Sequence, residues 1–340
     1  MTEPEFPKPE PADAERPAPQ RPGTRTFTLE GRSAPGLFLV GWLAFLMGAG
    51  CLGVAFVANV GAGVTFALAL VGLALLSLGL VAGAGSQAIE RRVAAADGAP
   101  ESPRGPSPFL VFAAAIPLSL FIVALVGIPL VALGMDTTGP LATLIAVAIQ
   151  ALVYLGLVRL LVVGTDALSW REMGIGGRPR AALIEDVASG MLIAVPILVV
   201  TAVLAALLSR FLPMPDSPLP PSGGTGGLLA NVLAAVVVAP LGEELFFRAF
   251  ATTAWARSMP IRSAVIRGAV FFAIGHVLTV GGADFGDAAG RALVAFVTRL
   301  PVALALGAIF MRRRSLAAPL ALHATFNALL IVIAQVAANG

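Results

Sequence analysis

The sequence predicts an all-α integral membrane protein with about eight to nine transmembrane helices in a polytopic bundle. Hydrophobic residues make up 58% of the 340 residues and charged residues only 12%, whereas soluble domains carry about 25% charged residues. Mean hydropathy is +0.92. Apolar stretches of the roughly 20 residues that a helix needs to cross a bilayer recur along the chain. Helices are expected because backbone polar groups in hydrocarbon must be satisfied within their own segment.

The apolar stretches define the expected spans. They lie at 36–60, 63–85, 108–133, 141–164, 190–212, 227–250, 264–280, 291–311 and 316–338. These stretches give nine spans, or eight if the first pair is partly re-entrant.

The segments outside the spans divide the chain into three parts. Residues 1–35 are rich in proline and in charges of both signs, so we expect a disordered cytoplasmic tail without a signal peptide. Residues 36–226 hold the N-terminal membrane helices. They include a basic segment near 165–189 that reads either as an amphipathic cytoplasmic segment at the lipid headgroups or as a plain loop. Residues 227–338 form the expected C-terminal membrane core, whose spans carry ionisable side chains.

Arginines predict the orientation in the membrane. Arginine-rich loops alternate with poorly basic ones, and cytoplasmic loops are the ones enriched in Lys and Arg. The N-terminus of this multi-pass cell-membrane protein is therefore expected in the cytoplasm. The net charge of +3 reflects these loops and does not indicate nucleic-acid binding. The arginines concerned are Arg91, Arg92, Arg104, Arg171, Arg178, Arg180, Arg257, Arg262, Arg312, Arg313 and Arg314.

Three of the later spans carry ionisable side chains. The chain has only two histidines, His276 and His323, and a third span holds Glu243 and Glu244. Each lies 9 to 14 residues from a cytoplasmic arginine, or about 13 to 20 Å along a helix. Ionisable groups at membrane depth are rare and normally face a bundle interior. We therefore expect the three spans to bring these groups together in one site.

Helical spacing separates the two glutamates. Glu244 and Arg248 are i,i+4 neighbours, so Arg248 can neutralise Glu244 in a structural ion pair while Glu243 points to another face. Asn327 shares the face of His323 by the same spacing, and Phe272 shares that of His276. The aromatic rings of this region, Phe247 and Phe272 among them, read equally as core packing or as the lining of a substrate groove.

These motifs resemble a known family. Glu-Glu-x-x-x-Arg from Glu243 to Arg248, Phe-x-x-x-His ending at His276 and His-x-x-x-Asn starting at His323 occur in this order on three hydrophobic segments. The combination is similar to the signature of the CPBP family of CAAX proteases and bacteriocin-processing enzymes, also called the ABI family, which is related to the Ras-converting CAAX endopeptidase. The resemblance covers about residues 228–330.

What the resemblance implies is an intramembrane endopeptidase. Glu243 and His276 would activate the hydrolytic water, and His323 and Asn327 would stabilise the oxyanion. The residues agree with these roles, since a carboxylate in a low-dielectric cavity suits a general base. Zinc held by Glu243, His276 and His323 would resemble a His₂Glu catalytic site, and the family has been assigned both metal-dependent and metal-free glutamate mechanisms. The sequence does not choose between them.

Other chemistries fit less well. No aspartate accompanies the two histidines for a serine-protease triad, and the zinc motif His-Glu-x-x-His is absent. A proton-coupled transporter could use buried Glu and His as a proton relay, and a non-catalytic immunity or scaffold protein could keep the same fold. The intact motifs favour the enzyme. Its expected partners are the lipid bilayer and a hydrophobic peptide or membrane-anchored protein substrate.

Overall fold

The computed structural model describes residues 28–97, 104–217 and 219–339, and within them the chain is built of helices and loops without a strand. The expected tail at 1–35 thus lies mostly outside the described residues. The helices are α1 Pro35–Val57, α2 Ala62–Ala96, α3 Pro108–Ala132, α4 Pro140–Val158 continued by η1 Arg159–Val163, α5 Arg180–Leu208, a composite helix Thr225–Ala256, α9 Ile261–Val277, α10 Phe285–Arg313 and α11 Ala317–Asn339.

Eight of these helices are long and apolar enough to cross a membrane, which confirms a polytopic all-α bundle. We expected eight spans instead of nine if the first pair of helices were partly re-entrant. However, α1 and α2 are both among the eight candidate spans, so the first pair does not account for the lower number. The exception is α9, whose 17 residues extend about 25 Å in a hydrocarbon layer of about 30 Å.

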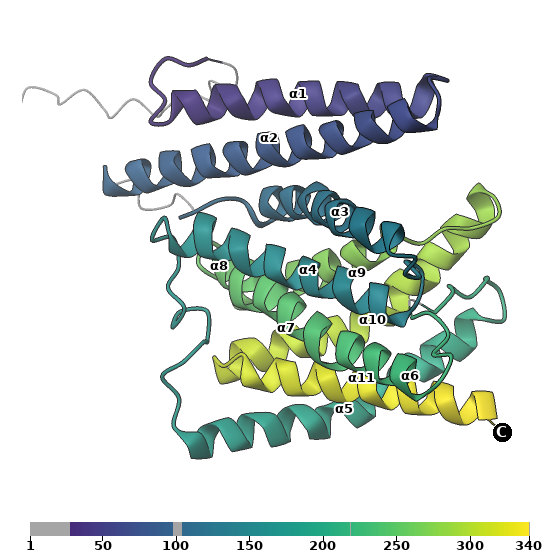
Figure 1. Cartoon of the computed structure of the whole chain (residues 1–340). Coiled ribbons are helices and arrows are strands. Elements are labelled where there is room, and N and C mark those ends of the chain that lie inside the picture. The colour runs from purple at the N-terminus through teal and green to yellow at the C-terminus, as the bar shows by residue number, and fades with distance from the viewer. Residues whose placement is uncertain (1–27, 98–103, 218, 340) are drawn as a thin grey trace, which may run out of the picture.

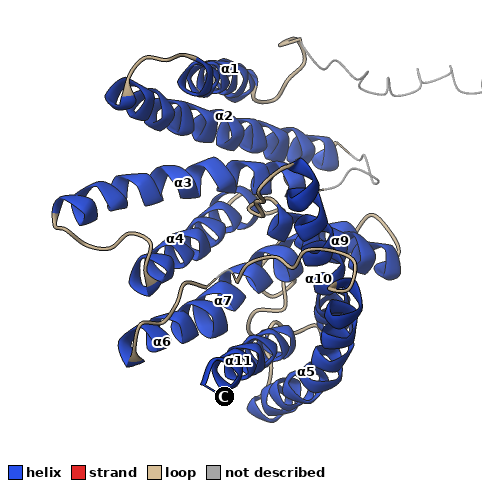
Figure 2. Ribbon diagram, turned by 90° about the vertical axis from the view of Figure 1, so that its right-hand side faces the viewer, coloured by secondary structure: helices blue, strands red, loops and turns tan. Residues whose placement is uncertain are grey.

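The helices form layers that leave the N-terminal hairpin at one edge. In Figure 1, α1 and α2 lie side by side along the top of the bundle, and α5 and α11 lie along the bottom. The turned view in Figure 2 shows α3 next to α2, followed by α4 and the composite helix. The hairpin packs through glycines. A Cβ on Gly79 would lie 2.4 Å from the backbone nitrogen of Phe45, so only glycine allows this approach.

The composite helix is irregular. It consists of α6 Thr225–Val232, the π-helical η2 Leu233–Val238, α7 Ala239–Glu243, the π-helical η3 Glu244–Thr252 and α8 Thr253–Ala256. Such π-helical turns change which backbone groups pair, and they are frequent at functional sites. Here the two π-helical stretches flank the five residues that end at Glu243.

The basic segment expected near 165–189 divides into two structures. Residues up to 179 are turns, and Arg180 already begins α5, ten residues before the expected span. The segment is anchored to the bundle because Met173 is fully buried and Arg257 at the end of α8 pairs with Glu172 and donates to the Ala167 carbonyl (2.7 Å). Hydrogen bonds from Ser169 hold the pKa of Glu172 below its usual range.

Candidate active site

Glu243 ends α7 where this helix lies very close to α4. A Cβ on the preceding residue, Gly242, would lie 2.8 Å from Cα and Cβ of Ala151, so the close approach depends on glycine. The Glu243 side chain keeps 16% of its surface exposed. It is therefore held among helices yet open to a reacting molecule.

Both histidines meet this carboxylate. His276 Nε2, near the end of α9, lies 3.7 Å from Glu243 Oε2, and His323 Nε2, on α11, lies 3.8 Å from the same oxygen. The expected convergence of three helices is thus present in the structure. Both distances exceed those of a direct hydrogen bond, about 2.7 to 3.2 Å, so a small group can lie between the atoms.

The other ring nitrogens fix the imidazoles. His276 Nδ1 lies 2.8 Å from the Phe272 carbonyl oxygen, and His323 Nδ1 lies 2.8 Å from Glu244 Oε1. Both partners are acceptors, which assigns a proton to each Nδ1. In the neutral form each Nε2 then presents a lone pair to Glu243. Two fixed lone pairs and one carboxylate oxygen therefore surround the same small space.

Glu244 and Arg248 form the buried pair that their spacing predicts. Arg248 Nη1 lies 2.9 Å from Glu244 Oε1, and the exposed fractions of the side chains are 2% and 0%. The guanidinium carbon also lies 4.1 Å from the centre of the Phe272 ring. Glu244 accepts from Arg248 and His323 through the same oxygen, a second contact that sequence spacing did not reveal.

Asn327 is already engaged with the composite helix. Its Nδ2 donates to the Ala235 carbonyl oxygen at 2.7 Å. In π-helical pairing the N–H of residue 240 would bond to this carbonyl, but residue 240 is Pro240 and has no N–H. Asn327 thus replaces a backbone donor and keeps one amide hydrogen for the site. Pro240, three residues before Glu243, was the sequence signal for this contact.

Phe247 and Phe272 are buried in this structure, and their expected role in lining a substrate groove stays a prediction. Each is only 2% exposed. Phe272 stacks on His276 with ring centres 4.2 Å apart, and Phe247 contacts Phe272 at 5.2 Å and Phe112 of α3 at 5.7 Å. In this structure both rings therefore pack within the aromatic core.

A further charge near the site is Arg299, for which the sequence offered no explanation. It lies at the middle of α10, one helical turn from the buried Ala295, whose carbonyl oxygen accepts from Arg299 Nη1 at 3.1 Å. Its charge acts on both Glu243 and His276. Glu243, Glu244, Arg248 and Arg299 together bring two negative and two positive charges to the region.

The donor set at the site matches zinc in its chemistry but not in its spacing. Glu243, His276 and His323 have the right chemistry, and hydrogen-bonded Nδ1 atoms are typical of metal-binding histidines. Tetrahedral ligands at about 2.0 to 2.1 Å from zinc would stand roughly 3.4 Å apart, compared with 3.7 and 3.8 Å here. Within residues 28–97, 104–217 and 219–339, no group of three or more His, Cys, Asp or Glu is arranged to hold a metal ion. As found, the arrangement does not fit zinc without rearrangement.

Comparison with known proteins identifies the domain around this site. The family model of type II CAAX prenyl endopeptidase Rce1-like proteins matches residues 225–329. The matched region begins with the composite helix and ends just after Asn327, so it contains every residue of the site. The resemblance drawn from the motifs is confirmed over these residues. No curated protein and no solved structure matches the chain.

Proposed function

Because residues 225–329 form an Rce1-like domain of the CPBP type, we propose that this chain is an intramembrane endopeptidase that hydrolyses a peptide bond with a water molecule held by Glu243. The observation that carries the proposal is the position of Glu243 Oε2 between His276 Nε2 and His323 Nε2, at 3.7 and 3.8 Å. In this proposal His276, His323 and Asn327 act on the same water molecule or on the substrate carbonyl that it attacks.

Glu243 is the proposed general base. A water hydrogen-bonded at about 2.8 Å to both Glu243 Oε2 and His276 Nε2 bridges such a gap. As the water oxygen attacks the substrate carbonyl carbon, its proton passes to Glu243. Glu243 then delivers this proton to the leaving nitrogen, so the carboxylate is restored when the C–N bond breaks. His276 orients the water, because its lone pair is fixed by the bond from Nδ1 to the Phe272 carbonyl.

His323 and Asn327 are the proposed oxyanion donors. His323 Nδ1 is bound to Glu244, so Nε2 donates only when the ring is the imidazolium. The remaining Asn327 amide hydrogen supplies a second donor. With His323 protonated, Glu243, Glu244, Arg248 and Arg299 leave the region with one excess positive charge. As the oxyanion forms, Glu243 takes up the water proton, so the region keeps this excess positive charge, which attracts the oxyanion.

The proposed substrate is a hydrophobic peptide or a membrane-anchored protein. The site lies among membrane-spanning helices, and the large side chains on the outer surface are apolar, such as Phe211 and Leu192. A substrate segment that partitions into the bilayer is therefore concentrated around the helices that carry the site. No step of this mechanism passes through a metal, and the zinc content of the active protein is to be measured.

The test is hydrolysis by the purified full-length chain. The protein in detergent is incubated with a library of hydrophobic peptides, and the products are read by mass spectrometry. Cleavage at defined bonds, absent from the Glu243→Gln variant, supports the proposal. Proton-coupled solute uptake by reconstituted protein, without any cleavage, would favour the carrier function instead.

A further inference from the structure

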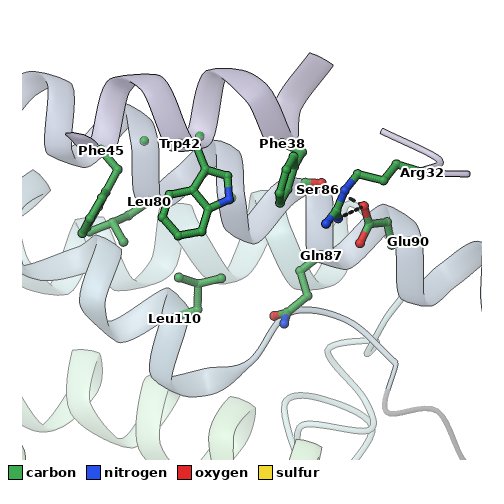
Figure 3. A pocket seen from close by; sticks show the side chains of 12 residues that line it. Arg32, Phe38, Trp42, Phe45, Leu80, Ser86, Gln87, Glu90 and Leu110 are labelled. Carbon is green, nitrogen blue, oxygen red and sulfur yellow. Dashed lines mark hydrogen bonds and ion pairs between the residues drawn. The ribbon is translucent and has the colours of Figure 1, made fainter. Parts of the chain in front are cut away.

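A second site lies away from the proposed active site, on the N-terminal hairpin. α1, α2 and the start of α3 border a half-open cavity of about 310 Å³. Figure 3 shows Phe38, Trp42 and Phe45 of α1 pointing toward Leu110 of α3, with α2 behind them. The helices concerned are candidate membrane spans, so the apolar part of this cavity faces the hydrocarbon layer.

The cavity has one polar end. Arg32 Nη1 and Glu90 Oε1 form an ion pair at 2.8 Å, with Ser86 and Gln87 beside it (Figure 3). The Arg32 guanidinium carbon also lies 3.4 Å from the centre of the Phe38 ring. These polar residues lie just before α1 and near the end of α2, on the side of the membrane where the arginine pattern predicts the cytoplasm. The cavity therefore suits an amphiphile with one polar end.

We propose that this cavity binds a bilayer phospholipid with a zwitterionic, amine-bearing headgroup of the phosphatidylethanolamine class. The acyl chain lies along Phe38, Trp42, Phe45 and Leu110. The phosphate binds Arg32, and the ammonium donates to the Glu90 carboxylate.

Charge complementarity selects this headgroup. Arg32 and Glu90 carry opposite charges, so an anionic headgroup would place an added negative charge beside Glu90. A zwitterionic headgroup brings one charge of each sign and can exchange partners with the pair. An ammonium donates hydrogen bonds to Glu90, whereas a quaternary choline has no N–H to donate.

Packing links the lipid site to the rest of the bundle. Leu80 of α2 and Leu110 both border the cavity and also pack against the main hydrophobic core. This core contains Phe112, whose ring is 5.7 Å from that of Phe247. A bound lipid thus fills space between the hairpin and α3, and its binding should stabilise the folded chain by linkage.

Gly83 offers a direct way to block the cavity. It borders the cavity, and a Cβ at this position meets no atom within 4 Å. The side chain of a leucine at this position would occupy the proposed lipid volume, and its Cβ would not clash with the protein. Gly53 on α1 is a matched control, because its Cβ also meets nothing within 4 Å and it does not border the cavity.

The experiment measures lipid binding to the full-length protein in detergent. Phosphatidylethanolamine with brominated acyl chains is titrated in, and quenching of Trp42 fluorescence is followed in a Trp170→Phe/Trp255→Phe background, since the chain has three tryptophans. We expect saturable quenching that is at least tenfold weaker with Gly83→Leu and unchanged with Gly53→Leu. Glu90→Gln should abolish the preference for phosphatidylethanolamine over phosphatidylcholine and phosphatidylglycerol.

Native mass spectrometry gives a second readout that needs no tryptophan replacement. The otherwise wild-type chain should retain one phosphatidylethanolamine, and the Gly83→Leu variant should lose it. Equal retention by these two proteins would overturn the proposal. Non-saturating quenching that is the same for all three lipids would overturn it as well. Neither readout uses hydrolysis, so the result is independent of the proposed function.

Discussion

Glu244 Oε1 lies 2.8 Å from His323 Nδ1 and 2.9 Å from Arg248 Nη1, so one carboxylate oxygen joins two helices at the site. The other oxygen, Oε2, and Arg248 Nη2 are buried and have no hydrogen-bond partner among the residues that the structure describes. The pair is therefore only partly satisfied, and such polar clusters are sensitive to the loss of any member. Glu244 serves the fold through Arg248 and orients His323.

Removal of either member of the ion pair should reduce the folded yield. Glu244→Ala leaves a buried guanidinium, and Arg248→Ala leaves a buried carboxylate, each at a cost of about 3 to 5 kcal/mol. Thermal unfolding and monodisperse yield in detergent measure the effect. Glu244→Gln, which keeps an oxygen for His323, should lose less stability than Glu244→Ala. If both alanine variants were as stable as wild type yet inactive, Glu244 would belong to the chemistry.

Glu243→Gln should abolish hydrolysis while leaving folding intact. The amide has almost the same shape but cannot accept the proton from water, and general-base catalysis contributes about 10² to 10⁴-fold. Glu243 is partly exposed and not a member of the buried pair, so thermal stability should stay close to wild type. More than about a tenth of wild-type turnover in the folded variant would exclude Glu243 as the essential base.

Much of the fold could be predicted because hydrophobic length directly reports membrane spans. The boundaries were less predictable. α2 continues to Ala96 and α5 begins at Arg180, since charged side chains at helix ends extend into the headgroup layer without ending the helix. α9 fell short of a full span because Pro260 and the turn after Val277 limit it to 17 residues.

The pairing of helices at the site could be predicted, whereas the contacts between side chains could not. The depth of Glu243, His276 and His323 follows from rise per residue. The bond from Glu244 to His323 depends on how α11 is rotated against the composite helix, for which linear spacing carries no information. From the sequence, Phe247 and Phe272 were equally consistent with core packing and with substrate binding. The structure adds that both rings are buried, which the sequence did not indicate.

Zinc dependence is decided by metal content measured together with activity. The observed separations of 3.7 and 3.8 Å lead us to expect active protein with far less than one bound zinc per chain. Dialysis against a chelator should leave hydrolysis unchanged. One equivalent of zinc that is lost in parallel with activity, and restores activity on re-addition, would establish a catalytic metal at Glu243, His276 and His323.

Arg299→Gln should reduce hydrolysis by about tenfold or more. The substitution removes a positive charge that acts on the region where the oxyanion forms, and a tenfold loss of rate corresponds to about 1.4 kcal/mol. Arg291→Gln is the matched control. It removes the same charge from the same helix, where Arg291 pairs with Asp287 and Asp216. An equal loss of kcat/KM in both variants would show that general charge, and not position, is responsible.

The hydrogen bond from Asn327 to the Ala235 carbonyl allows the structural role of Asn327 to be tested separately from its proposed catalytic role. Asn327→Ala leaves the Ala235 carbonyl without its donor, which costs about 1 to 3 kcal/mol, and removes an oxyanion donor worth about 10² to 10³-fold in kcat. Pro240→Ala supplies the missing N–H at residue 240. The double variant Pro240→Ala/Asn327→Ala should therefore regain thermal stability but not hydrolysis. If hydrolysis also recovered, Asn327 would act only through the helix that carries Glu243, and the oxyanion role would be excluded. If stability did not recover, the Ala235 carbonyl would not be the group that Asn327 satisfies.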